Sequence, residues 1–332
     1  DDARRHALGQ HFTSEPDILK VVRPTIIEPW EARIEAAKTI AELEQLLIAL
    51  QAFRVLDPAC GSGNFLYMGY NGLKDIEATI LSKIQDRRRS DALKGQGVFG
   101  FVTTNQFFGM DTDPFAVELA RVTLMIARKV AHDRLGLTEQ ELPLDNLDKN
   151  IVQADALFTP WPEADAIIGN PPFLGGKHMR LNLGDGYIDR VFARFPDVRD
   201  SVDFCSYWFR LAHDALKDDG QAGLVATNSI RHGKSRRATL DYIKQNGGFI
   251  GSAVSTQPWS GEANVHVSIV NWSKQEPDSC RLDDQEVEVI NTSLRSTTDV
   301  SEAASLQVNR GYCFQGVIPV GKGFNVDPAT AL

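Results

Sequence analysis

The sequence has little cysteine, and its four cysteines are widely spaced along 332 positions: Cys60, Cys205, Cys280 and Cys313. None of them forms a CxxC pair, and none stands with histidine at the spacing of a zinc site. This pattern excludes a disulfide-rich secreted domain and disfavours a structural metal. We therefore expect a reduced intracellular protein that holds no metal ion.

Long apolar runs are absent as well. No stretch reaches the roughly 18–20 apolar residues that a spanning helix requires, and residues 1–5 lack the apolar region of a secretory signal. The sequence thus predicts a soluble protein of the prokaryotic cytoplasm. It also lacks an initiator methionine and stops at Leu332 without a closing element, so we expect both ends to be cuts through a longer polypeptide.

An excess of positive charge is missing too, since 44 acidic residues outnumber 35 basic ones and give a net charge of −9. Bulk electrostatic attraction to nucleic acid is therefore disfavoured. Two local clusters of basic residues remain, and we interpret them as contacts to backbone phosphates, with a solvated face as the alternative. The clusters are Lys177 with Arg180, and Arg231, Lys234, Arg236 and Arg237.

What the sequence does contain is a regular alternation of apolar strands with helices. This alternation predicts an α/β fold with a doubly wound, mostly parallel sheet that helices cover on both faces. Two further strands, at 249–255 and 265–272, are expected to pair as a terminal hairpin. The other strands are expected at 53–58, 107–111, 151–155, 164–169 and 222–227, and the helices at 64–89, 114–132, 204–216 and 235–245.

The same pattern divides the chain into three parts. Residues 1–52 form an N-terminal helical segment, in which 30–51 is expected to be one amphipathic helix. Residues 53–272 form the sheet domain, and within it the glycine-rich and charged stretch 174–200 is expected to be a loop. Residues 273–332 are interpreted as a polar linker and the truncated beginning of a further region.

A glycine-rich loop follows the first predicted strand and opens a helix, with the sequence DPACGSGNF at 57–65. Gly61 and Gly63 permit a tight turn and a close approach of the backbone to a ligand. The helix N-terminus offers free N–H groups to a carboxylate or phosphate. Leu66 stands where a dinucleotide fingerprint has its third glycine, and the Gly-Lys-Ser/Thr of a P-loop is absent. The loop therefore favours neither pyrophosphate nor ATP.

Three acids stand at successive strand ends, where open parallel sheets bind their ligands. Asp57 is placed to face an ammonium group, Asp111 to accept hydrogen bonds from ribose hydroxyls, and Asp155 to hold an adenine amino group. A ligand that combines these groups with a carboxylate is S-adenosyl-L-methionine, which we predict as the cofactor. The alternative is that the glycines form only a tight turn and the acids cap helices.

The fourth predicted strand ends in a rigid corner, Asn170-Pro171-Pro172-Phe173. Two prolines fix φ and donate no backbone hydrogen bond. The Asn170 side-chain oxygen and the Pro171 carbonyl are placed to accept both protons of an exocyclic amino group, on a base that Phe173 stacks against. Such acceptors localise the nitrogen lone pair for attack on a methyl group. The alternative is a rigid turn that only closes the strand.

These segments resemble the gamma-class N6-adenine DNA methyltransferases. DPACGSG at 57–63 is similar to their cofactor motif and NPPF at 170–173 to their catalytic motif, while GQHFTS at 9–14, GMDTDP at 109–114 and QADAL at 153–157 fit further cofactor motifs. The resemblance covers residues 8–272. It implies that the cofactor is contacted by Thr13, Asp57, Ala59, Gly61, Gly63, Asp111, Asp155 and Asn170.

The resemblance also has implications for the fold and the substrate. It implies a seven-stranded sheet whose last strand is antiparallel, and a target adenine flipped out of double-stranded DNA. Trp259 is the candidate for a second wall of the base pocket, with a tryptophan that anchors the hairpin as the alternative. The tail, with CFQG at 313–316 and GKGF at 321–324, resembles type IIL restriction–modification enzymes of the MmeI kind, in which a nuclease domain precedes and a target-recognition domain follows.

Two other kinds of function stay open at this point. N4-cytosine, RNA-adenine and protein-glutamine methyltransferases use a related Asn/Ser/Asp-Pro-Pro corner on an amino or amide nitrogen. A non-catalytic binding module that kept the fold is the second alternative. Cys60 lies in the glycine loop, so we interpret it as a packing residue rather than as the nucleophile of cytosine ring-carbon methylation. The acids and glycines that argue against a binding module are all intact: Asp57, Gly61, Gly63, Asp111 and Asn170.

Overall fold

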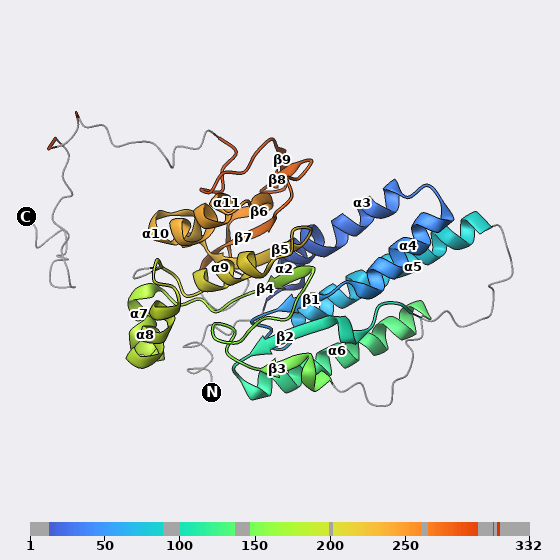
Figure 1. The fold of residues 1–332 in the computed structure, drawn as a ribbon, viewed down its shortest axis with the longest axis horizontal. Coiled ribbons are helices and arrows are strands. Elements are labelled where there is room, and N and C mark those ends of the chain that lie inside the picture. The colour runs from blue at the N-terminus through green and yellow to red at the C-terminus, as the bar shows by residue number, and fades with distance from the viewer. Residues whose placement is uncertain are drawn as a thin grey trace, which may run out of the picture. The chain divides into compact units, whose positions relative to one another are not determined.

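The computed structural model describes residues 13–88, 100–136, 147–198, 202–259, 265–297, 308 and 311–312. The chain divides into two compact units, Asp1–Thr298 and Asp299–Leu332. Nearly all of the described residues belong to the first unit, whose helices and strands are drawn in Figure 1. None of the described helices combines the length with the hydropathy that crossing a membrane requires.

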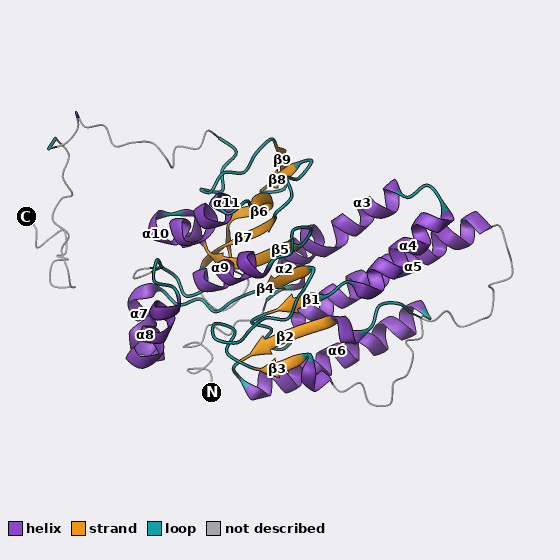
Figure 2. Cartoon of the chain, viewed as in Figure 1, coloured by secondary structure: helices purple, strands orange, loops and turns teal. Residues whose placement is uncertain are grey.

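A single sheet forms the centre of the first unit, and its nine described strands have the order β3-β2-β1-β4-β5-β7-β6-β8-β9 (Figure 2). Neighbours among β1 to β5 pair in parallel, whereas β7 is antiparallel to both β5 and β6. The strands are β1 Val55–Asp57, β2 Phe107–Asp111, β3 Ile151–Gln153, β4 Ala166–Gly169, β5 Gln221–Thr227, β6 Phe249–Pro258, β7 His266–Ser273, β8 Cys280–Leu282 and β9 Gln285–Val287.

Helices lie on both sides of this sheet. Two pairs of helices are each joined by a π-helical stretch. Arg23–Ile27 joins α2 to α3, and Arg237–Asp241 joins α10 to α11. The helices are α2 Glu15–Val22, α3 Glu28–Ala36, α4 Ile40–Ala52, α5 Asn64–Arg88, α6 Pro114–Leu135, α7 Gly176–Leu183, α8 Asp185–Arg194, α9 Ser206–Ala215, α10 Gly233–Arg236 and α11 Tyr242–Gln245.

Two hydrophobic cores fill the space between the sheet and its helices, because successive strand residues point to opposite faces. In β4, Ala166 and Ile168 enter one core, while Ile167 between them enters the other. The first core is completed by apolar residues of α2 to α6, and the second by residues of α7 to α9 and α11. The predicted doubly wound α/β fold is therefore confirmed.

The number of strands differs from the expectation. The seven expected strands are present, with β7 antiparallel, but β8 and β9 extend the sheet beyond β6. They lie in the stretch that we predicted to be a linker, so that prediction was wrong for 280–287. Asp283 and Asp284 both adopt positive φ, 51° and 63°, and form the tight turn between the two strands. Two strands of only three residues each, joined by Asp-Asp, have too short an apolar pattern to be predicted from the sequence.

The prediction of one helix over 30–51 was also wrong. α3 ends at Ala36 and α4 begins at Ile40. Thr39 caps the second helix, because its hydroxyl accepts a hydrogen bond from the Glu42 amide at 3.2 Å, while the Glu42 carboxylate accepts one from the Thr39 amide at 2.9 Å. This reciprocal capping box starts a new helix inside a continuous apolar pattern.

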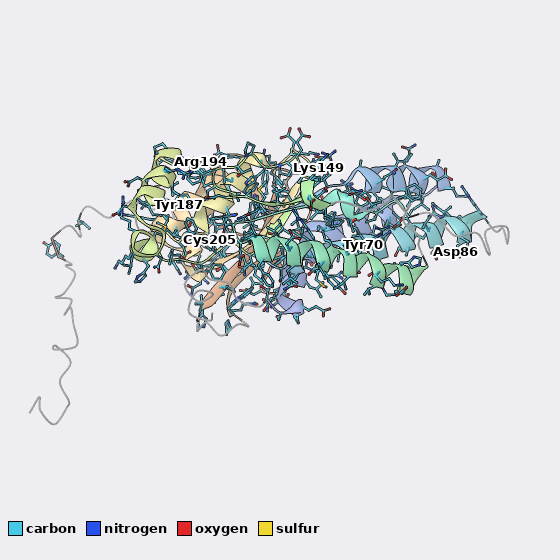
Figure 3. All side chains as sticks on the ribbon, turned by 90° about the horizontal axis from the view of Figure 1, so that it is seen from below. Tyr70, Asp86, Lys149, Tyr187, Arg194 and Cys205 are labelled. Carbon is cyan, nitrogen blue, oxygen red and sulfur yellow. The ribbon has the colours of Figure 1, made fainter. Side chains whose placement is uncertain are left out.

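The predicted loop over 174–200 contains two helices instead, α7 and α8. Each is polar over most of its surface and is anchored by few apolar side chains, namely the buried Met179, Ile188 and Val191. Because the stretch is highly charged and has few apolar residues, the helical spacing of those residues was not recognised in the sequence. Figure 3 shows Tyr187 and Arg194 of α8 at the same end of the unit as Cys205, far from Asp86 near the end of α5.

Candidate active site

Four parallel strands end side by side at one edge of the sheet. β1 ends at Asp57, β2 at Asp111 and β4 at Gly169, immediately before Asn170. β3 ends at Gln153, so Asp155 lies two residues past its strand rather than within it as predicted. Because these strands are neighbours in the sheet, the loops that follow them gather at the same edge. The fold thereby brings the predicted site segments together.

The glycine loop is shaped by two residues with positive φ, Gly61 at 50° and Gly63 at 85°. A Cβ atom on Gly63 would lie 3.0 Å from the Cα atom of Ala120, so α6 packs too closely against the loop for a side chain. The Gly61 amide donates to Asp111 Oδ2 at 3.0 Å. Asp111, predicted as a ribose acceptor, therefore also fixes the neighbouring loop.

Asp57 is fully buried at the end of β1. Its Oδ1 accepts a hydrogen bond from the Ala59 amide at 3.0 Å, while Oδ2 is buried with no hydrogen-bond partner among the described residues. Burial, reinforced by the charge of Asp111, raises the pKa of the Asp57 carboxyl to about 8. Near neutral pH this carboxyl is therefore largely protonated, and a cationic ligand group would favour its ionised form.

We expect the free energy of unfolding of the wild-type chain to fall, relative to an Asp57→Asn variant, as the pH rises from about 4 to about 8. The folded chain keeps the Asp57 proton up to a pKa of about 8, whereas the group's ordinary pKa is 3.8. The stabilisation is complete below the lower value and is lost as the pH rises through the higher one, with a slope of at most about 1.4 kcal/mol per pH unit. Urea unfolding of both proteins across this range measures the difference, and a constant difference would contradict the raised pKa.

Gly169 joins the Asp57 carboxyl to the Asn-Pro-Pro-Phe corner, a role that sequence reasoning missed. Its φ is 152°, and a Cβ atom placed on it would lie 2.5 Å from Asp57 Oδ1. The carboxyl therefore packs directly against the backbone of the residue before Asn170. A glycine at a strand end is too common to signal such a contact without the structure.

Only one of the two polar side-chain atoms of Asn170 has a hydrogen-bond partner among the described residues. Its Nδ2 donates to the hydroxyl of the buried Thr13 at 3.5 Å, whereas Oδ1 is buried and finds no hydrogen-bond partner among the described residues. The structure thus brings together two of the predicted site residues and leaves an amide oxygen available as an acceptor. The segment 9–12 of the predicted GQHFTS motif lies outside the described residues.

The carboxylate of Asp155 accepts hydrogen bonds from other residues of the protein. Its Oδ1 accepts a hydrogen bond from the Leu157 amide at 2.9 Å, and its carboxylate also accepts one from the hydroxyl of Tyr187 in α8. Burial and the Asp155 charge raise the pKa of Tyr187 well above its ordinary value. A carboxylate has about four acceptor positions, so these bonds leave room for a ligand amino group. Tyr187 was missed because 174–200 was expected to be a loop.

Phe173 and Trp259, the two predicted stacking residues, contact each other. Their ring centroids are 6.3 Å apart and the rings meet edge to face at 68°. Trp259 is only 4% exposed and belongs to the first core, as the hairpin-anchoring alternative expects. The residues that follow it, 260–264, lie outside the described part of the chain. The role of Trp259 as a wall for a base stays a prediction.

Some of the basic residues predicted to contact phosphates already have partners within the protein. Arg180 pairs with Asp185 and Asp189 at 3.0 and 2.9 Å. Arg236 pairs with Asp241 at 3.3 Å and donates to Ser293, and Arg231 donates to the Ser255 carbonyl. Three others are exposed at the surface: Lys177, Lys234 and Arg237.

Cys60 fits its interpretation as a packing residue. It is buried in the first core, and burial raises the pKa of its thiol well above the ordinary value, with the charges of Asp57 and Asp111 adding to the effect. A thiol held protonated is a poor nucleophile.

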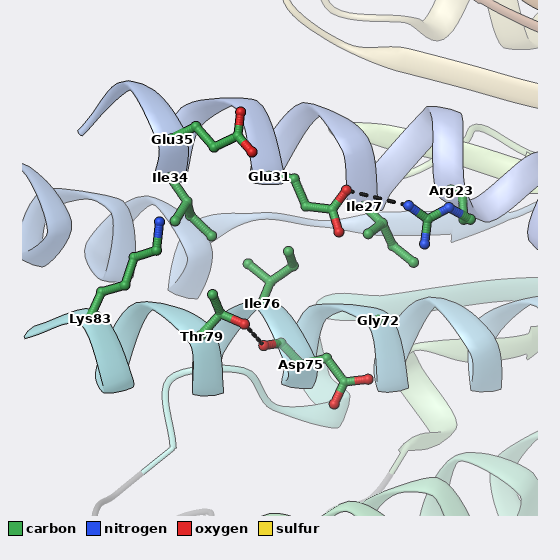
Figure 4. A pocket seen from close by; sticks show the side chains of 10 residues that line it. All are labelled: Arg23, Ile27, Glu31, Ile34, Glu35, Gly72, Asp75, Ile76, Thr79 and Lys83. Atoms are coloured by element: carbon green, nitrogen blue, oxygen red, sulfur yellow. Dashed lines mark hydrogen bonds and ion pairs between the residues drawn. The ribbon is translucent and has the colours of Figure 1, made fainter. Parts of the chain in front are cut away.

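The residues at this edge suit a ligand that carries both a cation and hydrogen-bonding groups. Asp57 Oδ2 and Asn170 Oδ1 are buried polar atoms with no hydrogen-bond partner among the described residues, and buried polar atoms are nearly always satisfied. A cavity of about 460 Å³ elsewhere, between α3 and α5, has Arg23, Glu31 and Lys83 in its lining (Figure 4). None of the predicted site residues lines that cavity, so it is separate from the candidate site.

Comparison with known proteins places the chain in context. Residues 33–283 match the family described as "MmeI, DNA-methyltransferase domain". DNA methyltransferase A of Bacillus subtilis (strain 168) is 27% identical over 282 residues, 80% of this chain and 31% of that protein. The adenine-specific methyltransferase BrxX of Escherichia coli O9:H4 (strain HS) is 32% identical over 111 residues, 33% of this chain and 8% of that protein.

Among solved structures, the type IIL restriction–modification enzyme MmeI in complex with DNA has a TM-score of 0.75 and 25% identity, over 90% of this chain and 43% of that one. The chain therefore spans about a third of the Bacillus subtilis relative and less than half of MmeI. The matched family covers most of the sheet and its helices. The chain belongs to the family of MmeI-type DNA-methyltransferase domains.

Proposed function

We propose that this chain transfers a methyl group from S-adenosyl-L-methionine to the N6 amino group of adenine in specific double-stranded DNA, as part of a restriction–modification system. The observation that carries the proposal is the free Asn170 Oδ1. It lies at the proline corner next to Gly169, whose backbone packs against the Asp57 carboxyl. An acceptor with no partner of its own suits a substrate amino group.

S-adenosyl-L-methionine is the methyl donor of class I methyltransferases, and when bound it supplies an electrophilic methyl group on a sulfonium. In this chain the buried Asp57 suits the donor's ammonium group, and Asp111 and Asp155 suit its ribose and adenine, because each carboxylate keeps free acceptor positions. Gly61 and Gly63 leave the loop without side chains where a ligand approaches. Thr13, Ala59 and Asn170 complete the proposed cofactor contacts.

The corner has a chemical role that needs no side-chain nucleophile. An adenine amino nitrogen is a weak nucleophile because its lone pair is delocalised into the ring. Asn170 Oδ1 and the Pro171 carbonyl would accept hydrogen bonds from its two N–H groups and stabilise the positive charge that develops on nitrogen. Pro172 keeps the turn rigid, and Phe173 would stack on the base, which contributes about 1–3 kcal/mol in comparable contacts.

Adenine is favoured over the alternative acceptors by two observations. Phe173 follows the prolines directly, and the matching relative in Escherichia coli is named an adenine-specific methyltransferase. The DNA partner is supported by the family and by the exposed Lys177, Lys234 and Arg237. A target-recognition domain and a nuclease domain on the same parent chain are part of the proposal, as is a cytoplasmic location.

Transfer of an isotope-labelled methyl group tests the proposal. The full-length parent protein is incubated with labelled S-adenosyl-L-methionine and, in separate reactions, with mixed-sequence double-stranded DNA, RNA or protein, and the labelled nucleosides or peptides are identified by mass. We expect label in N6-methyl-2′-deoxyadenosine. Label in N4-methyl-2′-deoxycytidine, or transfer only to RNA or protein, would replace the adenine assignment, and no transfer to any of them would support a binding module.

Asp111→Ala is expected to weaken binding of S-adenosyl-L-methionine by roughly tenfold, which corresponds to about 1.4 kcal/mol. The variant loses a ribose acceptor and the hydrogen bond that holds the Gly61 amide. Isothermal titration calorimetry measures the dissociation constant. Asp113→Ala, which removes the helix cap of α6 and a neighbouring carboxylate charge but leaves the Asp111 side chain in place, is the matched control and should bind within about threefold of the wild type. Equal affinity of all three proteins would remove Asp111 from the cofactor site.

A further inference from the structure

The residue after the proline corner is held on both sides by the turn that leads into α9. The Leu174 amide donates to Asp203 Oδ1 at 3.1 Å, and the Leu174 carbonyl accepts from the Phe204 amide at 2.9 Å. Pro171 and Pro172 have no N–H, so backbone donors cannot anchor the corner at those positions. The Leu174 peptide is therefore a point at which hydrogen bonds fix the corner.

Asp203 also reaches the neighbouring strand. Its Oδ2 accepts a hydrogen bond from the Thr227 hydroxyl at 3.1 Å, and Thr227 is the last residue of β5. The Cys205 amide donates to Asp203 Oδ1 at 3.4 Å, just before α9 begins. One carboxylate thus ties together the segment after β4, the end of β5 and the start of α9.

The same helix contacts the glycine loop. Trp208 of α9 donates its Nε1–H to the carbonyl of Pro58 at 3.0 Å, and this contact is buried. Pro58 directly follows Asp57. α9 is therefore hydrogen-bonded through Trp208 to the proposed donor segment and, through the turn before it, to the proposed acceptor segment. The helix therefore links the two segments a second time, in addition to the pairing of β1 with β4.

We infer that Asp203 is a positioning residue for methyl transfer, which sets the place of the Asn-Pro-Pro-Phe corner relative to the glycine loop. The inference rests on the proposed function, because it assigns Asp203 to that same site. Reacting atoms must approach to about 3–3.5 Å in line, and a displacement of about 1 Å costs on the order of 100-fold in rate. Asp203 acts through Leu174 and has no contact with the reacting atoms itself.

Three variants test this role. Asp203→Ala is expected to lower the single-turnover rate of methyl transfer to DNA by roughly 10- to 100-fold, while the dissociation constant for S-adenosyl-L-methionine changes by less than about threefold. Asp203→Asn should restore most of the rate, because its amide oxygen still accepts from Leu174 and its NH₂ group donates to the Thr227 hydroxyl. Thr227→Val, which removes the bond to Asp203 together with the hydrogen bond between the Thr227 and Ser229 hydroxyls, should fall between them. Asp219→Ala, an exposed acid in the turn before β5, is the matched control with an unchanged rate.

Hydrogen exchange at the Leu174 amide tests the same contact without catalysis. It should become about tenfold faster in Asp203→Ala and stay near the wild-type rate in Asp203→Asn. An unchanged transfer rate in Asp203→Ala, or unchanged exchange at Leu174, would overturn the inference. If Asp203→Ala does not fold, Thr227→Val decides by the same two measurements. These rates are measured on the full-length parent protein; if its wild-type form transfers no methyl group to DNA, the proposed function fails, and the exchange result still decides whether Asp203 fixes the corner.

Discussion

Asn170→Ala is expected to lower methyl transfer to DNA by about 10³-fold but to change the affinity for S-adenosyl-L-methionine by only about threefold, because Asn170 is one of several proposed cofactor contacts. Removing one aligned acceptor or donor at a developing charge typically costs about 10²–10³ in rate. Asn170 Oδ1 is such an acceptor, buried and without a competing partner. Its loss removes a contact that the proposed reaction needs mainly in the transition state.

The measurement separates chemistry from binding. Single-turnover transfer of labelled methyl groups gives the rate, and calorimetry gives the cofactor affinity of the same preparation. Asn182→Ala is the matched control, since Asn182 is an exposed asparagine of α7 whose amide donates only to the His178 carbonyl among the described contacts. Equal loss of rate and of cofactor binding in Asn170→Ala would mean that the corner is structural, and an unchanged rate would remove Asn170 from catalysis.

Gly169→Ala is expected to lose both cofactor binding, by at least about tenfold, and methyl transfer. The new methyl group would lie 2.5 Å from Asp57 Oδ1, well inside van der Waals contact. A φ of 152° is also unfavourable for alanine. Overpacking of this kind costs about 1–3 kcal/mol, so either the buried carboxyl or the corner must move, and each is part of the proposed site.

Thermal unfolding and calorimetry on the same variant check this result. The midpoint of unfolding should drop by several degrees, because a destabilisation of about 1 kcal/mol shifts it by about 2–4 °C in a domain of this size. Gly186→Ala is the control, since a Cβ atom there meets no heavy atom within 4 Å. Normal cofactor affinity in Gly169→Ala would show that Asp57 and the corner tolerate separation.

The strand-end acids were predictable from sequence because their placement follows from local pattern alone. An apolar run that stops at Asp57 or Asp111 is a strand that ends there, and parallel topology then gathers the ends at one edge. The proline corner was predictable for the same reason, since proline limits its own backbone whatever surrounds it. The fold class follows from this alternation.

Contacts between distant segments were beyond sequence reasoning. Asp203 binds the Leu174 amide and the Thr227 hydroxyl, which are 29 and 24 positions away, and no periodicity marks such a residue. Glycine is required at position 169 because the Asp57 carboxyl packs against its backbone, and only the structure shows this contact. The full burial of Asp57, and hence its raised pKa, likewise depends on packing from both faces of the sheet. Trp259 is a further example. Its position in the sequence suggested a wall of the base pocket, whereas the structure buries it in the first core.

The sheet closes on neither side in the described part of the chain, and this affects how the protein behaves at high concentration. Its outermost strands, β3 and β9, are each three residues long. Unpaired N–H and C=O groups on an outer strand are a template for strands of other molecules. Three residues offer few such groups, and the exposed Glu286 adds charge to β9. The open ends of the sheet therefore give little support to fibrillar aggregation.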